Sequence, residues 1–243
     1  MAKAAVRVER KNGIALWRQI ADRIRLAVGS GEFADRLPPE TALAERFGVN
    51  RHTVRAAIAA LVQEGVLRAE QGRGTFVERR RRFSYPVGAR TSFSEGLRGQ
   101  AKDRRGVLLG HALEAADERT AEALGIPKGG RVVRLETLAE ADGRPVSRAT
   151  IFFDAARFPG IEKGYAESGS VTLALKSFGV PAYFRHSTRI SARHASDADL
   201  ADLRLSPGAI VLVTVYVNVD ADGQPLQFAE TRFAADLVEL AVD

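Results

Sequence analysis

The sequence predicts an α+β protein of two domains, and three observations support this prediction. The 243 residues, of which 45% are hydrophobic and 27% charged, can form one large or two modest globular domains. Residues 1–78 combine helical apolar patterns with glycine-containing turns, whereas the remainder contains an internal repeat with strand-like patterns. The net charge changes along the same division, from +4 in residues 1–78 and +7 in residues 79–105 to −5 in residues 106–243. The basic front indicates a polyanion-binding domain, although ordinary surface variation could produce the same imbalance.

Composition and motifs also exclude several classes of protein. The chain has no cysteine, which excludes disulfides and thiolate metal sites. His111, His186 and His194 have no metal-ligand spacing, and no nucleophile-elbow or phosphate-loop motif occurs. No apolar run reaches the ~18–20 residues of a membrane helix, and the N-terminus has no signal-peptide pattern. We therefore expect a cytoplasmic protein without metal, cofactor or catalytic residues.

The first domain is predicted to begin with three helices. Apolar residues recur at helical spacing in residues 16–28 and again in residues 41–47, with glycines and prolines between the two segments. A tight turn at Gly48 and Val49 leads to Asn50, a good N-cap for a third helix that runs to about residue 64. Two short helices that meet across such a turn are typical of a helix-turn-helix motif.

A glycine-rich hairpin completes the first domain. Residues 66–70 and 75–77 are predicted strands, joined through Gln-Gly-Arg-Gly at 71–74. The first turn of the preceding helix, residues 50–55, is polar and basic, as in a helix that presents donors to base edges and phosphates. A basic hairpin beside such a helix predicts a winged helix that binds double-stranded DNA. Arg73 at the hairpin tip would then reach a phosphate or the minor groove.

These segments resemble the GntR family of bacterial transcription regulators. The resemblance rests on LPPE at 37–40, LAERFGVNR at 43–51, TVR at 53–55 and QGRGTFV at 71–77. It implies DNA contacts from the start of the third helix and from the hairpin tip. Position 41 departs from the family, which often has arginine there. The DNA-contact set is Glu40, Thr41, Asn50, Arg51, His52, Thr53, Arg55, Gly72 and Arg73.

Residues 79–91 are predicted to be a linker between the domains. Four adjacent arginines at 79–82 cannot be buried comfortably, so this segment is expected to be exposed. The arginines either add phosphate contacts or keep a hinge solvated. The expected boundaries are 1–78 for the winged helix, 79–91 for the linker and 92–243 for the second domain.

The second domain contains an internal duplication. The pattern L-x-I-x-x-G-x-x-V at 124–132 recurs as L-x-L-x-x-G-x-x-V at 203–211, and ADGRPV at 141–146 recurs as ADGQPL at 221–226. Because Asp-Gly between alternating runs predicts a hairpin, each half reads as helix, strand, hairpin turn and strand. Two such halves predict a mostly antiparallel sheet with helices on one side, and a ligand cleft between the halves.

Two helix starts in this domain are candidate anion sites. Residues 92–95 (Ser-Phe-Ser-Glu) fit a capping box just after Arg90, and residues 168–172 open a second helix in a similar way. A helix N-terminus offers free N–H groups and the positive end of the helix dipole to an anion. Simple capping is the alternative interpretation.

Residues from about 90 to 240 resemble the UTRA effector-binding domain of the HutC subfamily, which is similar to the chorismate lyase fold but senses a ligand. The supporting segments are 129–132, 142–145, 158–160 and 222–225, and the segments at 49–58, 83–86, 90–94 and 187–193 are similar to PhnF-type regulators of phosphonate-use operons. Related sugar-phosphate sensors carry two arginines and a glutamate where this chain has Thr137, Ala139 and Ala149. Together with possible counter-charges, the resemblance gives the effector-binding set Arg90, Ser92, Phe93, Ser94, Thr137, Arg148, Ser170, Thr172 and Arg185.

The sequence thus predicts a transcription regulator, expected to repress phosphonate uptake and degradation genes. A homodimer would bind a pseudo-palindromic double-stranded operator, and a small anionic effector, a phosphonate or a phosphate-like compound, would release it. Three alternatives remain. They are a regulator of the same fold that answers to a sugar phosphate, urocanate or a fatty acid, an architectural DNA binder, and a lyase-like enzyme.

Overall fold

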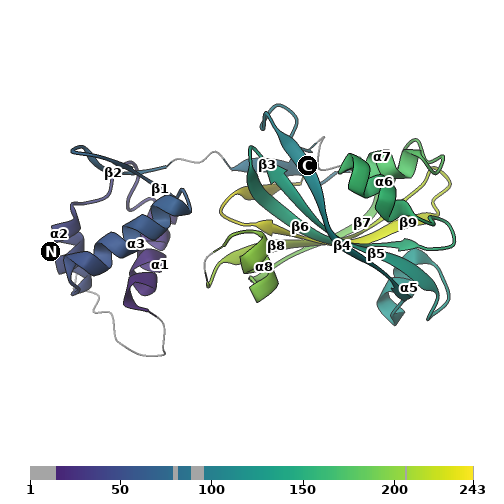
Figure 1. The fold of residues 1–243 in the computed structure, drawn as a ribbon, viewed down its shortest axis with the longest axis horizontal. Helices are drawn as coiled ribbons and strands as arrows, with labels where there is room; N and C mark the ends of the chain where they lie inside the picture. Colours follow the sequence, from purple (N-terminus) through teal and green to yellow (C-terminus); the bar gives the residue numbers. More distant parts are fainter. Residues whose placement is uncertain (1–14, 79–81, 89–95, 206, 243) are drawn as a thin grey trace. The chain divides into compact units, whose positions relative to one another are not determined.

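Helices dominate the first part of the chain and an antiparallel sheet dominates the second, which confirms the predicted α+β class (Figure 1). The computed structural model describes residues 15–78, 82–88, 96–205 and 207–242. The chain divides into two units, the first ending at residue 81 and the second beginning at residue 82. Each unit has its own hydrophobic core.

The first unit is a winged helix. It contains α1 (Leu16–Gly29), α2 (Glu40–Phe47) and α3 (Arg51–Gln63), followed by β1 (Leu67–Glu70) and β2 (Gly74–Val77). Helix α2 ends at Gly48, whose φ of 65° is left-handed and therefore suits glycine. The side chain of Asn50 caps α3 by accepting a hydrogen bond from the backbone N–H of Thr53 at 2.8 Å. The predicted turn and N-cap are thus confirmed.

The hairpin that forms the wing is joined to the segment between α1 and α2 at Arg36. Strands β1 and β2 pair in antiparallel register, and Arg36 forms an isolated bridge with Phe76 of β2. Gly74 has a φ of 111°, and a Cβ at this position would lie 2.7 Å from Nη2 of Arg36. Glycine at 74 therefore permits both the turn and the close approach of the arginine.

The second unit is built on a six-stranded antiparallel sheet in the order β4-β5-β6-β9-β8-β7. The sheet strands are β4 (Arg104–Ala115), β5 (Arg131–Ala141), β6 (Arg144–Asp154), β7 (Phe184–His194), β8 (Ile210–Val219) and β9 (Pro225–Ala234). The helices are α5 (Glu118–Leu124), α6 (Ile161–Ser168), α7 (Val171–Lys176) and α8 (Asp197–Asp202).

The predicted duplication appears as two halves, β4-α5-β5-β6 and β7-α8-β8-β9. The halves join where β6 pairs with β9, with Thr150 opposite Glu230 at the middle of the seam. The first Asp-Gly turn is tight, since Asp142 and Gly143 both have positive φ. The two halves therefore form one continuous sheet.

Helices cover both faces of this sheet, so the expectation of helices on one side was wrong. Helices α6 and α7 pack on the face that contains Leu135 and Ile151. Helices α5 and α8 pack on the opposite face, α5 against Val132 and α8 against Leu138. The physical reason is that β5, β6 and β9 have buried residues at both odd and even positions, so both faces need apolar cover.

Part of the expected linker belongs to the second unit. Residues of β3 (Phe83–Pro86) pair in parallel with β10 (Val238–Ala241). The ring of Tyr85 packs on Phe233, with centroids 4.9 Å apart. The expected 79–91 linker is therefore interrupted by a strand, because aromatic residues that follow the arginine run are drawn into the core of the second unit.

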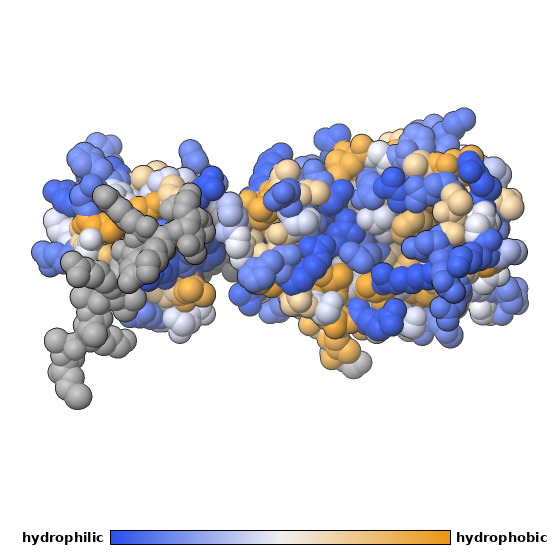
Figure 2. All heavy atoms as spheres, turned by 90° about the horizontal axis from the view of Figure 1, so that it is seen from below, coloured by the Kyte–Doolittle hydropathy of each residue, from blue (hydrophilic) through white to orange (hydrophobic). Residues whose placement is uncertain are grey.

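On the face that Figure 2 shows, the surface is mostly hydrophilic, with smaller hydrophobic patches. Leu26, Leu109 and Leu113 are among the exposed large apolar residues. Within the described parts of the chain, none of the helices combines the length and hydrophobicity that spanning a bilayer requires.

Candidate DNA interface and ligand cavity

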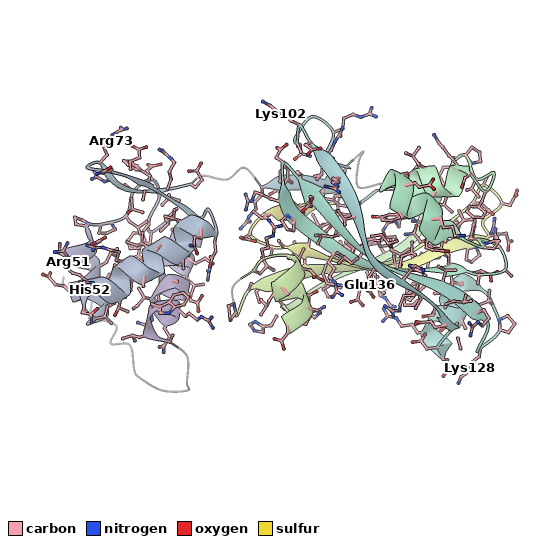
Figure 3. All side chains as sticks on the ribbon, viewed as in Figure 1. Arg51, His52, Arg73, Lys102, Lys128 and Glu136 are labelled. Atoms are coloured by element: carbon pink, nitrogen blue, oxygen red, sulfur yellow. The ribbon has the colours of Figure 1, made fainter. Side chains whose placement is uncertain are left out.

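The start of α3 and the wing tip form one candidate surface on the first unit. Figure 3 shows Arg51 and His52 at the N-terminal end of α3 and Arg73 at the end of the hairpin. An open groove of about 350 Å³ is lined by Glu40, Thr41, Arg51, Gly72 and Arg73, together with neighbouring residues. The structure thus brings together residues from the two segments that the sequence assigned to DNA contact.

Glu40 is the one acidic residue of this set. Its carboxylate accepts hydrogen bonds from Nε of Arg55 at 3.2 Å and Nη2 of Arg55 at 2.9 Å, and lies 3.5 Å from Nη2 of Arg51. The bond from Arg55 holds the pKa of Glu40 below its ordinary value. A carboxylate is repelled by phosphate, so Glu40 suits the task of orienting the two arginines rather than that of touching DNA.

The side chains of Asn50 and Thr53 are hydrogen-bonded to each other at the start of α3. The backbone N–H and Oγ1 of Thr53 both donate to Oδ1 of Asn50, at 2.8 and 2.9 Å. His52 and Arg55 are exposed on the same helical turn. Arg73 is 74% exposed and pairs with Glu70 at 2.6 Å. The exposed side-chain donors of the DNA-contact set are therefore those of Thr41, Arg51, His52, Arg55 and Arg73.

A cavity of about 90 Å³ lies on the second unit, between the sheet and the segment that joins α6 to α7. Its floor comes from β5 and β6 of one half and from β8 and β9 of the other, and Gly169–Thr172 form part of its wall. The cleft that the repeat predicted is therefore a cavity over the seam of the sheet, and both halves contribute to it. No aspartate or glutamate occurs among the described residues that line it.

Three residues of the predicted effector set line this cavity, namely Thr137, Ser170 and Thr172. Ser170 caps α7, accepting from the backbone N–H of Leu173 at 3.3 Å, as predicted. The hydroxyl of Thr172 is 2.9 Å from that of Tyr183. Arg185 lies beside the cavity, with its guanidinium 3.5 Å from the ring centroid of Tyr216, a lining residue.

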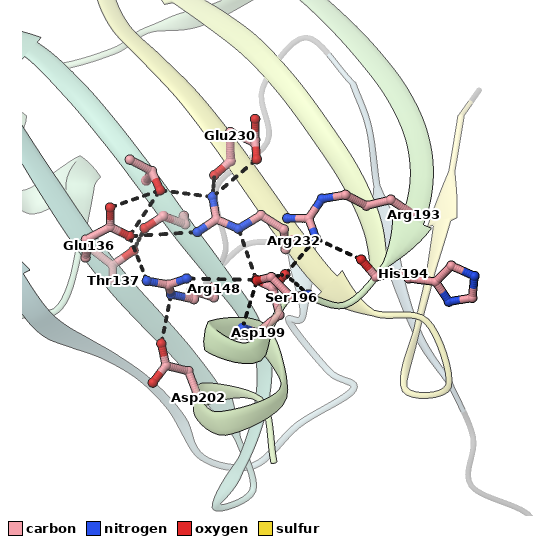
Figure 4. A network of polar contacts seen from close by, with 12 residues as sticks. Glu136, Thr137, Arg148, Arg193, His194, Ser196, Asp199, Asp202, Glu230 and Arg232 are labelled. Carbon is pink, nitrogen blue, oxygen red and sulfur yellow. Dashed lines mark hydrogen bonds and ion pairs between the residues drawn. The ribbon is translucent and has the colours of Figure 1, made fainter. Parts of the chain in front are cut away.

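Arg148 does not line the cavity, although the sequence suggested it as a counter-charge for the effector. Its neighbour Ala149 lines the cavity, and successive residues of a strand point to opposite faces. Arg148 instead binds Asp202 at 2.8 Å and Glu136 at 3.3 Å on the other face of the sheet (Figure 4). Arg90, Ser92, Phe93 and Ser94, and with them the first candidate anion site, lie outside the described residues.

Sequence reasoning missed the tyrosines. All four tyrosines of the chain, at positions 85, 165, 183 and 216, line the cavity. Burial raises the pKa of Tyr85, Tyr165 and Tyr183, so these phenols stay neutral. No motif could have found them because they come from β3, α6, β8 and the segment before β7, and only the fold brings them together.

The opposite face carries a network of buried charges between the sheet and α8 (Figure 4). Asp199 is fully buried and accepts from Arg193 at 2.8 Å and from the hydroxyl of Ser196 at 2.8 Å. Arg232, 4% exposed, lies 3.5 Å from Asp199 and 3.8 Å from Glu136. The network ties α8 to β5, β6 and β9, and we assign it a structural role.

Comparison with known proteins assigns both units. Residues 16–77 match the bacterial regulatory proteins of the gntR family, and residues 100–239 match the UTRA domain. An HTH-type transcriptional regulator of Rhizobium meliloti (strain 1021) is 52% identical over 97% of this chain and 98% of its own. The probable transcriptional regulator PhnF of Escherichia coli (strain K12) is 33% identical over 86% of each chain.

The fold also recurs in a solved structure. The crystal structure of PhnF from Mycobacterium smegmatis superimposes with a TM-score of 0.63 over 92% of this chain and 98% of that one, at 24% sequence identity. The chain therefore belongs to the GntR family of bacterial transcriptional regulators, as a member of HutC and PhnF type with a C-terminal UTRA domain, and is a regulator rather than an enzyme.

Proposed function

We propose that this protein represses genes of phosphonate uptake and degradation, and that a small anionic effector bound in the cavity releases it from operator DNA. The observation that carries the effector class is the cavity itself. Hydroxyl-bearing residues such as Thr137, Ser170 and Thr172 line it without a carboxylate among the described lining residues, and Arg185 stands at its edge. The similarity to PhnF of Escherichia coli supports the choice of target genes.

On the DNA side, we propose that a homodimer binds a pseudo-palindromic operator. Arg51, His52 and Arg55 would read bases and phosphates in the major groove, with Thr41 and Thr53 beside them, while Gly72 and Arg73 would follow the backbone or the minor groove. Asn50 would shape the helix start, and Glu40 would hold Arg51 and Arg55 in place. Effector and DNA would be linked through two conformations of the protein, for which each ligand has different affinity.

The test is fluorescence anisotropy of a labelled DNA fragment from upstream of the protein's own gene, at one stated salt concentration. We expect tight binding that excess scrambled DNA does not displace, and release by an alkylphosphonate but not by urocanate. Release by a sugar phosphate alone would move the effector assignment to that class. Binding without sequence preference would instead favour an architectural DNA binder.

Replacing Arg55 by alanine tests the recognition helix. We expect operator affinity to fall by about 1–3 kcal/mol, with less discrimination against mismatched sites, because Arg55 would lose a base contact. The measurement is the same anisotropy titration on operator and mismatched fragments. Lys128→Ala is the charge-matched control, since Lys128 is an exposed residue of the second unit. An equal loss on every DNA sequence would make Arg55 a phosphate contact.

A further inference from the structure

Two polar atoms beside the cavity are buried without a hydrogen-bond partner in the described structure. They are Oδ1 of Asn218, an acceptor, and Nε of Arg185, a donor. Asn218 is 3% exposed and lines the cavity. An unpartnered buried polar group is costly, so both atoms are suited to bind a ligand.

The two residues lie next to each other on neighbouring strands. Arg185 of β7 is directly opposite Asn218 of β8 in the antiparallel register. Opposite residues point to the same face, with Cβ atoms roughly 4.5–5.5 Å apart. The positive charge of Arg185 also acts on the phenols of Tyr85 and Tyr183, where it opposes the rise in pKa that burial causes. Its guanidinium also lies 3.5 Å from the ring centroid of Tyr216.

The orientation of Asn218 is fixed by its neighbour. Nδ2 of Asn218 donates to Oε1 of Gln227 on β9 at 2.9 Å. This bond uses the donor side of the amide and leaves Oδ1 as the free acceptor. The cavity therefore combines a cationic donor that suits an anion with a neutral acceptor that needs a donor from the ligand.

The donor that suits this acceptor is neutral. An ammonium group would bring a second positive charge close to that of Arg185, and the described lining residues include no carboxylate to balance it. A hydroxyl group satisfies Oδ1 without that cost. The volume of about 90 Å³ admits only a small molecule.

We propose that the effector is a small organic anion that carries a hydroxyl group close to its anionic end. The anion is bound by Arg185, and the hydroxyl donates to Oδ1 of Asn218. This inference rests on the proposed function, and it adds the hydroxyl group and the two residues that select it.

The experiment is isothermal titration calorimetry of the full chain, without DNA, against two ligands that differ only in the donor. These are 2-hydroxyethylphosphonate and ethylphosphonate. We expect the hydroxylated ligand to bind about tenfold more tightly, the effect of one hydrogen bond to a buried acceptor. We expect 2-aminoethylphosphonate to bind more weakly than the hydroxyl compound.

Two variants separate the roles of the residues. Asn218→Leu should bind 2-hydroxyethylphosphonate and ethylphosphonate with about equal affinity. Arg185→Met should lower the affinity for both ligands by the same factor and so keep the ratio of their affinities. Ser191→Ala is the matched control, because Ser191 lies at an exposed position of β7, the strand that carries Arg185. It should change neither affinity. Thermal melting of each variant checks that it is folded.

The outcomes distinguish this inference from the function beneath it. Equal affinity of the wild-type protein for the hydroxylated ligand and for ethylphosphonate overturns the hydroxyl selection but leaves the anionic effector standing. Tighter binding of the ammonium compound also overturns it. If none of the three binds although operator DNA does, the anionic effector itself is wrong. Because the comparison of the three ligands on the wild-type protein decides the question, the proposal can be tested even if a variant fails to fold.

Discussion

Gly106→Ala is expected to destabilise the second unit and to abolish ligand binding. A Cβ on Gly106 would overlap the carbonyl oxygen of Gly169 and lie 2.9 Å from the hydroxyl of Tyr165. Because the carbonyl oxygen of Gly169 belongs to the backbone, the turn after α6 must move away from β4 to make room for the Cβ. Overpacking of this kind costs about 1–3 kcal/mol, and the displaced segment includes the cavity wall at Gly169 and Ser170.

The strand contains its own control. Gly110 is on β4 as well, and an added Cβ there meets nothing within 4 Å. Gly110→Ala should therefore melt close to the wild-type temperature and bind ligand normally. Thermal unfolding by circular dichroism and calorimetric titration are the two measurements. A Gly106→Ala protein that melts and binds like Gly110→Ala would show that β4 and α6 are not in the close contact described.

Asp199→Ala is expected to have the larger effect on stability. The substitution removes the carboxylate that faces Arg193 and Arg232 and deletes the capping box of α8. Breaking a buried ion pair by removing one partner costs about 3–5 kcal/mol, because the charge of Arg232 then stays buried with only the longer contacts to Glu136 and Glu230, at 3.8 and 3.6 Å, to balance it. For a unit of this size the melting temperature should fall by about 10 °C.

Two comparisons identify the cause of that loss. Asp197→Ala, at an exposed position in the first turn of the same helix, should have a small effect. The double variant Asp199→Ala, Arg232→Met should recover part of the stability, because both charged partners are then gone. If the double variant melts below the single one, the buried charge is not the reason for the loss.

The same carboxylate makes stability depend on pH. Burial alone would raise the pKa of Asp199, but the hydrogen bonds from Ser196 and Arg193 outweigh burial and hold the pKa below its ordinary value. A group whose pKa is lowered by folding stabilises the fold above its unfolded-state pKa, about 3.9, and loses this contribution as the pH falls through the folded-state value. The difference in melting temperature between wild type and Asp199→Asn should therefore be constant near neutral pH and shrink in acid.

Features set by neighbouring residues were predictable from the sequence. Asn50 and Ser170 cap helices because their side chains reach N–H groups three residues later. The Asp-Gly turn at 142–143 follows from residues that accept positive φ. The repeat likewise indicated two hairpins, since each half shows the same strand and turn pattern.

Features that depend on residues far apart in the sequence could not be predicted. The pairing of β3 with β10 joins segments at opposite ends of the second unit, and nothing near Tyr85 in the sequence indicates it. The face on which Arg148 lies depends on strand register, which a bulge between Ala139 and Glu140 shifts. Arg185, which the sequence analysis included in the effector set, does lie at the edge of the cavity. Its stacking on Tyr216, however, results from the pairing of β7 with β8, which no local pattern specifies.

The seam between β6 and β9 has a consequence for how the second unit folds. Each hairpin of the duplication pairs strands that are close in sequence, so closing it costs little chain entropy. The seam joins Thr150 to Glu230 and can form only after a much longer segment has been ordered. Contacts of such high sequence separation slow folding. The hairpins should therefore form early and the seam late, so the cavity that depends on the seam is among the last features to be completed.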